Sequence, residues 1–141
     1  MAVLVDTSAL LALIDVSDGH HQAVRSFVER TAEALLLPVT VLPEIDYLVA
    51  SRLGVGVELA MLRAFARGEM RLEALTVRDL QRCIEIVEKY ADSDIGFVDA
   101  SIVALAERLG VSRVLTLDRR HFTMFQPKHC DALELVPWDI Q

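Results

Sequence analysis

Short apolar runs alternate along this chain with longer segments in which apolar residues recur every three or four positions. The short runs predict buried strands at residues 2–5, 34–39, 71–75, 113–117 and 133–136. The longer segments predict helices at residues 8–15, 20–32, 41–53, 57–68, 79–90 and 95–109, with Thr40 as the cap of the third. Strands that alternate with helices are typical of an α/β fold with a mostly parallel sheet. No linker or repeat interrupts the pattern, so we expect a single domain over residues 1–141.

The spacing of apolar residues also predicts which side of each helix faces the core. The side expected to be buried in the helix at 79–90 consists of Leu80, Ile84 and Val87. The best-marked helix, at 95–109, turns inward with Ile95, Val98, Ile102, Leu105 and Leu109. The apolar side of residues 59–65 fits the core, a dimer contact or a partner contact equally well.

Composition narrows the class of protein. Hydrophobic residues make up 53% of the chain and charged residues 25%, which is typical of a globular protein. No apolar run reaches the roughly 18 residues that span a bilayer, and no basic stretch precedes the first apolar segment, so we expect a cytoplasmic protein without a signal peptide. The net charge of −7 argues against a broad basic surface for nucleic acid. It still permits an enzyme whose negative charge is concentrated in a metal site.

Four acidic residues stand next to predicted strands or at the starts of helices. Asp6 ends the first strand and Asp118 ends the strand at 113–117, while Glu44 and Asp99 lie near the starts of two helices. Because the carboxyl ends of parallel strands share one edge of the sheet, all four should gather there. Glu44 and Asp99 are spaced three or four positions from apolar neighbours, so we expect both to border the buried face.

Each of these acidic residues alone is compatible with a turn or a helix start, but the four together predict a metal site. Two like charges about 4 Å apart repel by roughly 4 kcal/mol at an effective dielectric constant of 20. A divalent cation removes this repulsion, and a set of oxygen ligands favours Mg²⁺ or Mn²⁺ over zinc. A metal held in this way suits phosphoryl chemistry.

The stretches that carry these residues resemble those of the PIN-domain ribonucleases, in particular the VapC-type toxins of type II toxin–antitoxin pairs. They are VDTSALLALID, PVTVLPEIDYL, DSDIGFVDASIVALAERLG and VLTLDRRHF. The resemblance covers nearly the whole chain. It implies a PIN-like fold in which helices sandwich a mostly parallel sheet. The activity that it implies is Mg²⁺-dependent endonucleolytic cleavage of RNA by a metal-activated water, leaving a 5′-phosphate and a 3′-hydroxyl.

The same resemblance implies roles for individual residues and for partners. The catalytic metal ligands would be Asp6, Glu44, Asp99 and Asp118. Supporting positions would be Thr7, Ser8 and Thr116, which could hold water or phosphate, and Asp94, which could instead cap a helix. The family further implies a homodimer and a small antitoxin that blocks the active site, often with an arginine. The surplus negative charge of this chain suits a basic partner.

Several residues near these motifs have two interpretations. Arg119, with Arg120 and His121, could contact RNA phosphate or lie in a solvated turn. Trp138, Phe122 and Phe125 could stack on bases, although we expect them to pack beneath the last strand.

Two other functions fit an acidic sheet edge. One is a Mg²⁺-dependent phospho-acceptor or phosphatase-like protein, of the receiver or haloacid-dehalogenase type. The lack of a second aspartate two positions after Asp6, and of a clear late lysine, argues against it. The other is a binding module without catalysis, which inward-pointing carboxylates would serve poorly. The sequence leaves open which RNA is cut and whether one or two metals bind.

Overall fold

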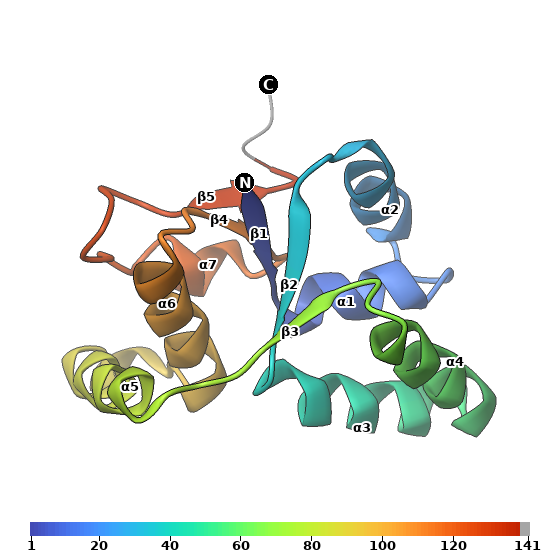
Figure 1. Ribbon diagram of the computed structural model, residues 1–141, viewed down its shortest axis with the longest axis horizontal. Helices are drawn as coiled ribbons and strands as arrows, with labels where there is room; N and C mark the ends of the chain where they lie inside the picture. The colour runs from blue at the N-terminus through green and yellow to red at the C-terminus, as the bar shows by residue number, and fades with distance from the viewer. Residues whose placement is uncertain (139–141) are drawn as a thin grey trace.

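The computed structural model describes residues 1–138 of the chain. In this part of the chain five strands form one sheet, in the order β3-β2-β1-β4-β5, and every pair of neighbours is parallel (Figure 1). The strands are β1 (Ala2–Val5), β2 (Ala34–Pro38), β3 (Arg71–Glu73), β4 (Arg113–Leu115) and β5 (Glu134–Val136). The α/β fold with a parallel sheet is therefore confirmed. β3 and β4 end two residues earlier than the apolar pattern predicts.

Helices cover both faces of this sheet. They are α1 (Thr7–Ile14), α2 (His21–Arg30), α3 (Val41–Leu53), α4 (Val55–Ala66), α5 (Val77–Lys89), α6 (Phe97–Leu109) and α7 (Arg119–Phe122), with a 3₁₀ turn, η1 (Ala91–Ser93). Figure 1 shows α5 and α6 on one side of the sheet and α1, α2 and α4 on the other. The sequence pattern did not predict α7 and η1, because single turns are too short to show periodicity. In residues 1–138, no helix has the length and apolar character needed to cross a membrane.

The strand order places a topological switch point between β1 and β4. From β1 the chain builds outward through β2 to β3, and it later returns to the other side of β1 with β4 and β5. Val5 is paired with Leu115, and the backbone N–H of Asp6 donates to the carbonyl of Leu115 at 2.9 Å. Asp6 and Thr116, the next residues along the two strands, therefore lie side by side. Ligands of parallel α/β sheets bind at such a point.

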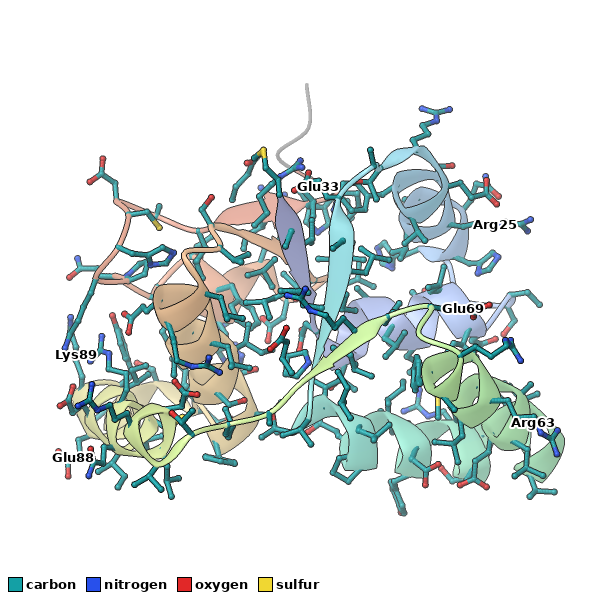
Figure 2. All side chains as sticks on the ribbon, in the orientation of Figure 1. Arg25, Glu33, Arg63, Glu69, Glu88 and Lys89 are labelled. Atoms are coloured by element: carbon teal, nitrogen blue, oxygen red, sulfur yellow. The ribbon has the colours of Figure 1, made fainter. Side chains whose placement is uncertain are left out.

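The core lies between the sheet and the helices, and α6 supplies much of it. Val3, Leu4 and Val5 of β1 are fully buried, and so are Ile102 and Leu105 of α6. Charged side chains such as Arg25, Arg63, Glu88 and Lys89 are exposed and point away from this centre (Figure 2). On α4, Met61 is buried and Leu62 and Phe65 pack against the core, whereas Leu59 is exposed.

The prediction of which side of α5 faces the core is wrong. Leu80 is 46% exposed and Ile84 is 53% exposed, and Val87 is only partly buried. The buried residues are instead Asp79, Cys83 and Ile86. Two interactions hold the helix in this rotation, a capping box between Thr76 and Asp79 and an ion pair of Asp79 with Arg108 of α6 at 2.9 Å.

The rotation of α5 is tested by comparing two leucines. Leu105→Ala is expected to lower the free energy of unfolding by about 3 kcal/mol, because it leaves a cavity in a fully packed core. Leu80→Ala should cost less than about 1 kcal/mol, because nearly half of Leu80 is already in water. Urea unfolding of both variants measures the difference. If both variants lost the same free energy of unfolding, the side of α5 that carries Leu80 would face the core.

Candidate active site

Asp6 stands at the carboxyl end of β1 and caps α1. The side chain is nearly inaccessible, since the residue is only 5% exposed. Its Oδ1 accepts the backbone N–H of Thr7 at 2.8 Å, and its Oδ2 accepts the hydroxyls of Thr116 at 2.7 Å and Ser8 at 3.0 Å. Burial raises the pKa of Asp6 above its usual value, while these hydrogen bonds act in the opposite direction and Asp118 adds to the increase. The carboxylate is thus held rigidly in one orientation.

Thr116 and Ser8 connect Asp6 to the loop that follows β4. The Thr116 hydroxyl accepts the backbone N–H of Asp118 at 2.9 Å, and the Ser8 hydroxyl accepts that of Leu117 at 3.0 Å. The two hydroxyl oxygens lie 3.4 Å apart. Thr7 differs from them, because its Oγ1 is buried and has no hydrogen-bond partner among the described residues. The two supporting hydroxyls therefore fix the position of Asp118 relative to Asp6.

Asp99, Asp118 and His121 form a second part of the site. Asp99 lies in the first turn of α6, and Asp118 caps α7 by accepting the backbone N–H of His121 at 3.1 Å. The Nδ1 atom of His121 lies 2.7 Å from Oδ2 of Asp118 and 3.9 Å from Oδ2 of Asp99. One ligand atom from each of these three residues lies within 4.8 Å of the others. All three side chains are partly exposed, so the group can be reached from solvent.

The pKa of Asp99 reflects both its burial and the negative charges around it. The pKa of Asp99 is raised from 3.8 to about 6, first by burial and then by the negative charges of Asp6 and Asp118. Glu44 adds a smaller increase, and His121 acts in the opposite direction. The charges of three carboxylates, those of Asp6, Asp118 and Glu44, thus all raise the pKa of Asp99.

Glu44 is not one of the three residues whose ligand atoms lie together, and it acts on Asp99 through its charge. The sequence pattern predicts that it borders the buried face, but Glu44 is exposed, while Val41, Ile45 and Val49 turn to the core. Because Ile45 points inward, the residue directly before it is turned about 100° away, toward solvent.

The start of α3 is also held differently than expected. Thr40 occupies the cap position, but its hydroxyl forms no capping hydrogen bond. It lies instead 2.6 Å from the hydroxyl of Ser101, which is fully buried in α6. This contact between α3 and α6 brings the helix starts that carry Glu44 and Asp99 together.

Asp94 and Arg119 are two further residues that the sequence singled out. Asp94 is exposed and has a left-handed backbone, with a φ of 57°. The cap position of α6 is occupied by Gly96, so Asp94 does not cap that helix. Arg119 is exposed at the start of α7, and its guanidinium lies 5.7 Å from the ring centre of Trp138.

The donor set fits a divalent cation. In residues 1–138 no lysine or arginine forms an ion pair with Asp6, Asp99 or Asp118, so His121 is the one basic group that faces them. Neighbouring carboxylates whose negative charges repel one another are stabilised by a bound cation, and oxygen ligands favour Mg²⁺ or Mn²⁺. From the sequence, His121 was expected to contact RNA phosphate or to lie in a solvated turn, and its contact with Asp118 was missed. His121 follows Asp118 by three positions, and in a helical turn this spacing brings two side chains into contact. That spacing was the signal in the sequence that could have predicted the contact.

Comparisons with known proteins agree with this geometry. The model of the PIN domain family matches residues 3–124. Ribonuclease VapC26 of Mycobacterium tuberculosis (strain ATCC 25618 / H37Rv) is 43% identical over 135 residues, which cover 96% of this chain and 100% of that protein.

Two solved structures have the same fold. The crystal structure of M. tuberculosis VapC20, described as a Sarcin-Ricin loop cleaving toxin, matches with a TM-score of 0.78 at 22% identity and covers 84% of this chain and 91% of that one. A toxin–antitoxin complex from Klebsiella pneumoniae matches with a TM-score of 0.68 at 15% identity, covering 87% of this chain and 92% of that one. At such low identities the likeness concerns the fold.

Proposed function

This chain belongs to the PIN domain family, among its VapC-type ribonucleases, and from that premise we propose that it is a Mg²⁺-dependent endoribonuclease toxin. The observation that carries the proposal is the acidic cluster at the carboxyl ends of β1 and β4, where ligand atoms of Asp99, Asp118 and His121 lie within 4.8 Å of one another and the nearby charges of Asp6 and Asp118 raise the pKa of Asp99. Such an arrangement is costly without a cation, and an acidic cluster with a cation suits phosphodiester hydrolysis.

The residues that would hold Mg²⁺, or Mn²⁺ in its place, are Asp6, Asp99 and Asp118, with Glu44 reaching the same point from its exposed position. When bound, the ion supplies charge neutralisation and Lewis acidity for the attack of water on a phosphate. Thr116 and Ser8 hold the Asp6 carboxylate in place through their hydroxyls. Thr7 supports it through its backbone N–H.

His121 acts on Asp118 in this proposal. An ionised carboxylate accepts hydrogen bonds only, so the 2.7 Å contact requires that Nδ1 of His121 carries the proton. The imidazole then donates to Asp118 and holds its orientation. Its second ring nitrogen, Nε2, is left as the atom that can accept a proton.

The geometry argues against a phospho-acceptor function. A phospho-acceptor aspartate needs an oxygen that can attack a phosphoryl donor, and room for the phosphoryl group that it accepts. The Oδ2 atom of Asp6 accepts two hydroxyls and the residue is 5% exposed, which leaves room for a cation at the remaining lone pair of Oδ1 but little for a phosphoryl group. We therefore expect no stable phosphoprotein with acetyl phosphate.

We further propose that a small antitoxin covers this site and that the toxin acts as a homodimer in the cytoplasm. The toxin–antitoxin complex of K. pneumoniae with the same fold supports the first part. An arginine of such a partner could occupy the acidic cluster, because its charge offsets the repulsion on Asp99.

The function is tested by incubating the purified chain with total RNA and Mg²⁺. We expect cleavage that a chelator stops and that added Mn²⁺ restores. Sequencing the ends identifies the target RNA and should show 5′-phosphates. Intact RNA at micromolar enzyme, in the presence of either metal, would overturn the proposal.

The support that Thr116 gives to Asp6 leads to a separate prediction. Thr116→Val keeps the shape of the side chain but removes both hydrogen bonds of the hydroxyl. We expect metal affinity to fall by about 10-fold, because removal of a residue that orients a metal ligand typically weakens metal binding by at least this factor. Titration of Mn²⁺ measures the change. The control is Thr123→Val, an exposed position that directly follows α7, which should bind metal normally.

A further inference from the structure

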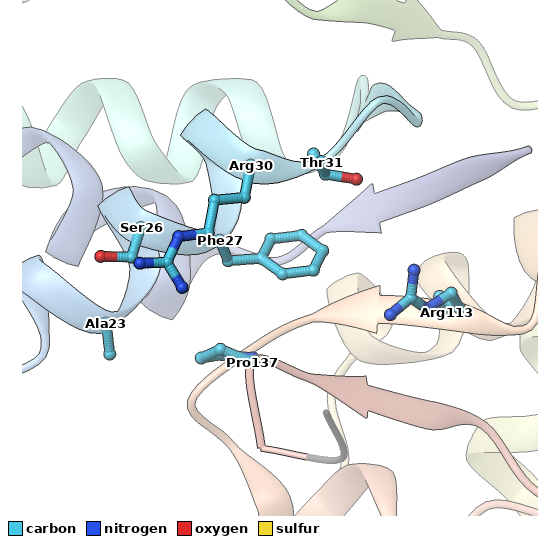
Figure 3. Close-up of a pocket in the computed structure, with 7 residues that line it drawn as sticks. All are labelled: Ala23, Ser26, Phe27, Arg30, Thr31, Arg113 and Pro137. Carbon is cyan, nitrogen blue, oxygen red and sulfur yellow. The ribbon is translucent and has the colours of Figure 1, made fainter. Parts of the chain in front are cut away.

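A concave surface beside α2 takes no part in the chemistry described above. It is a pocket of about 490 Å³ between α2 and the strands β4 and β5. Figure 3 shows the Phe27 ring of α2 in this pocket, with Arg30 and Arg113 on either side and Pro137 across from the helix. A volume of this size is within the range of small-ligand sites and could hold one nucleotide unit.

Trp138 continues the wall of this pocket toward the acidic cluster. It follows Pro137 directly and is half-buried, and its indole N–H donates to the carbonyl oxygen of Thr116 at 3.1 Å. The hydroxyl of the same threonine donates to Asp6. Trp138 thus packs partly against the core, and its indole also contacts the residue that supports Asp6.

Two basic side chains flank the Trp138 ring. The guanidinium of Arg119 lies over it at 5.7 Å, and the His20 ring meets it edge-on at a centroid distance of 5.7 Å. His20 directly precedes α2, and the side of this helix that leads away from it carries Ala23, Phe27 and Arg30. These residues define one continuous strip, the α2 strip, which consists of Arg119, His20, Trp138, Pro137, Phe27 and Arg30.

The charges of the α2 strip differ from those of the chain as a whole. The chain has a net charge of −7. Even so, neither Arg30 nor Arg119 forms an ion pair in residues 1–138, whereas Arg113 pairs with Glu33 and Glu134. Unpaired arginines beside an aromatic ring are the combination that binds single-stranded nucleic acid, through phosphate contacts and base stacking.

We propose that single-stranded RNA runs from the acidic cluster along the α2 strip. A base stacks on Trp138, Arg119 contacts the phosphate beside it, and Arg30 contacts a phosphate farther along α2. This inference rests on the proposed function, because the strip holds the RNA whose neighbouring phosphodiester bond is cut. Arg113 stays with its two glutamates and supports the pocket wall.

The sequence offers a direct probe, since Trp138 is the one tryptophan of the chain. The full chain is titrated in a chelator, so that nothing is cut, with a single-stranded RNA of about eight nucleotides. We expect RNA to quench the tryptophan fluorescence with the same dissociation constant that anisotropy of labelled RNA gives. Quenching by inorganic phosphate alone should be absent, because the signal arises from stacking.

Substitutions then separate stacking from charge. Trp138→Ala should weaken RNA binding by about 10-fold, and Trp138→Phe by less than about threefold, since a ring is retained. Arg30→Ala should weaken binding by about fivefold and lower the slope of log affinity against log salt by about one. The matched control is Arg63→Ala, an exposed arginine that projects from α4 (Figure 2), which should bind as the unchanged protein does.

The outcomes distinguish this inference from the proposed function. If the chain cuts RNA in Mg²⁺ but binds it without fluorescence change and without an effect of Trp138→Ala or Arg30→Ala, the inference is overturned and the function stands. If Trp138→Ala and Arg30→Ala weaken antitoxin binding and leave RNA binding unchanged, the strip is a protein contact and the inference is again overturned. A chain that binds RNA with quenching and never cuts it would instead overturn the function.

Discussion

Asp99→Asn is expected to reduce RNA cleavage by about 10²- to 10³-fold, because it removes one of the carboxylates that would hold the metal. Asparagine keeps the size of the side chain and lies in the first turn of α6 like the residue it replaces. The loss is measured as kcat/KM with a defined RNA in Mg²⁺. The control is Asp92→Asn in η1, an exposed position outside the cluster, which should cut at the normal rate.

The same substitution should stabilise the metal-free protein. The pKa of Asp99 is raised from 3.8 to about 6 in the folded state, mainly by burial and by the charges of Asp6 and Asp118. The folded state therefore binds the proton more tightly than the unfolded state, and stability falls as the pH rises from about 4 to about 6. Asp99→Asn removes this loss, and we expect about 1 kcal/mol of added stability near neutral pH.

Urea unfolding in a chelator, at about pH 4.5 and about pH 7, measures this effect. Between the two pH values the unchanged protein should lose more stability than Asp99→Asn does. Loss of the negative charge at Asp99 would then explain both results for Asp99→Asn, the more stable metal-free fold and the loss of RNA cleavage. A variant that is inactive and also unstable at both pH values would mean that Asp99 serves the fold rather than the site.

Addition of Mg²⁺ should raise the melting temperature at neutral pH. A ligand at 100 times its dissociation constant adds about 2.7 kcal/mol, which corresponds to roughly 8 °C for a chain of this size. The increase should shrink near pH 5, because Asp99 then holds a proton that competes with the cation.

The metal dependence is checked by differential scanning fluorimetry with Mg²⁺, Mn²⁺ and chelator. Asp99→Asn should lose most of the increase, and Asp92→Asn should retain it. An equal increase in all three proteins would show that the cation acts elsewhere on the surface.

Much of the fold could be predicted because the signals are local. The buried runs before Asp6 and Asp118 and the long periodic segment of α6 each reflect contacts that a strand or helix makes along its own length. The parallel sheet then follows from the alternation of strands and helices, and it places strand-end residues at one edge. For this reason the sequence could predict that Asp6, Asp99 and Asp118 lie close together, while their role as metal ligands stays a prediction.

Other features depend on which segments meet. The strand order that puts β1 beside β4 makes Thr116 a partner of Asp6, and no local pattern encodes that pairing. The sequence predicted the wrong rotation of α5, because the helix carries two apolar stripes and the ion pair of Asp79 with Arg108 of α6 favours the other one.

By itself, the sequence determined that this chain is an α/β protein with acidic residues at the ends of its strands, since burial and periodicity act within each segment. Only the tertiary structure decided that Glu44 is exposed, that His121 holds Asp118 and that Trp138 lies beside the cluster. These positions follow from contacts between residues far apart in the chain or within short turns. Such contacts leave no periodic signal, because their energy is gained only when the segments pack together.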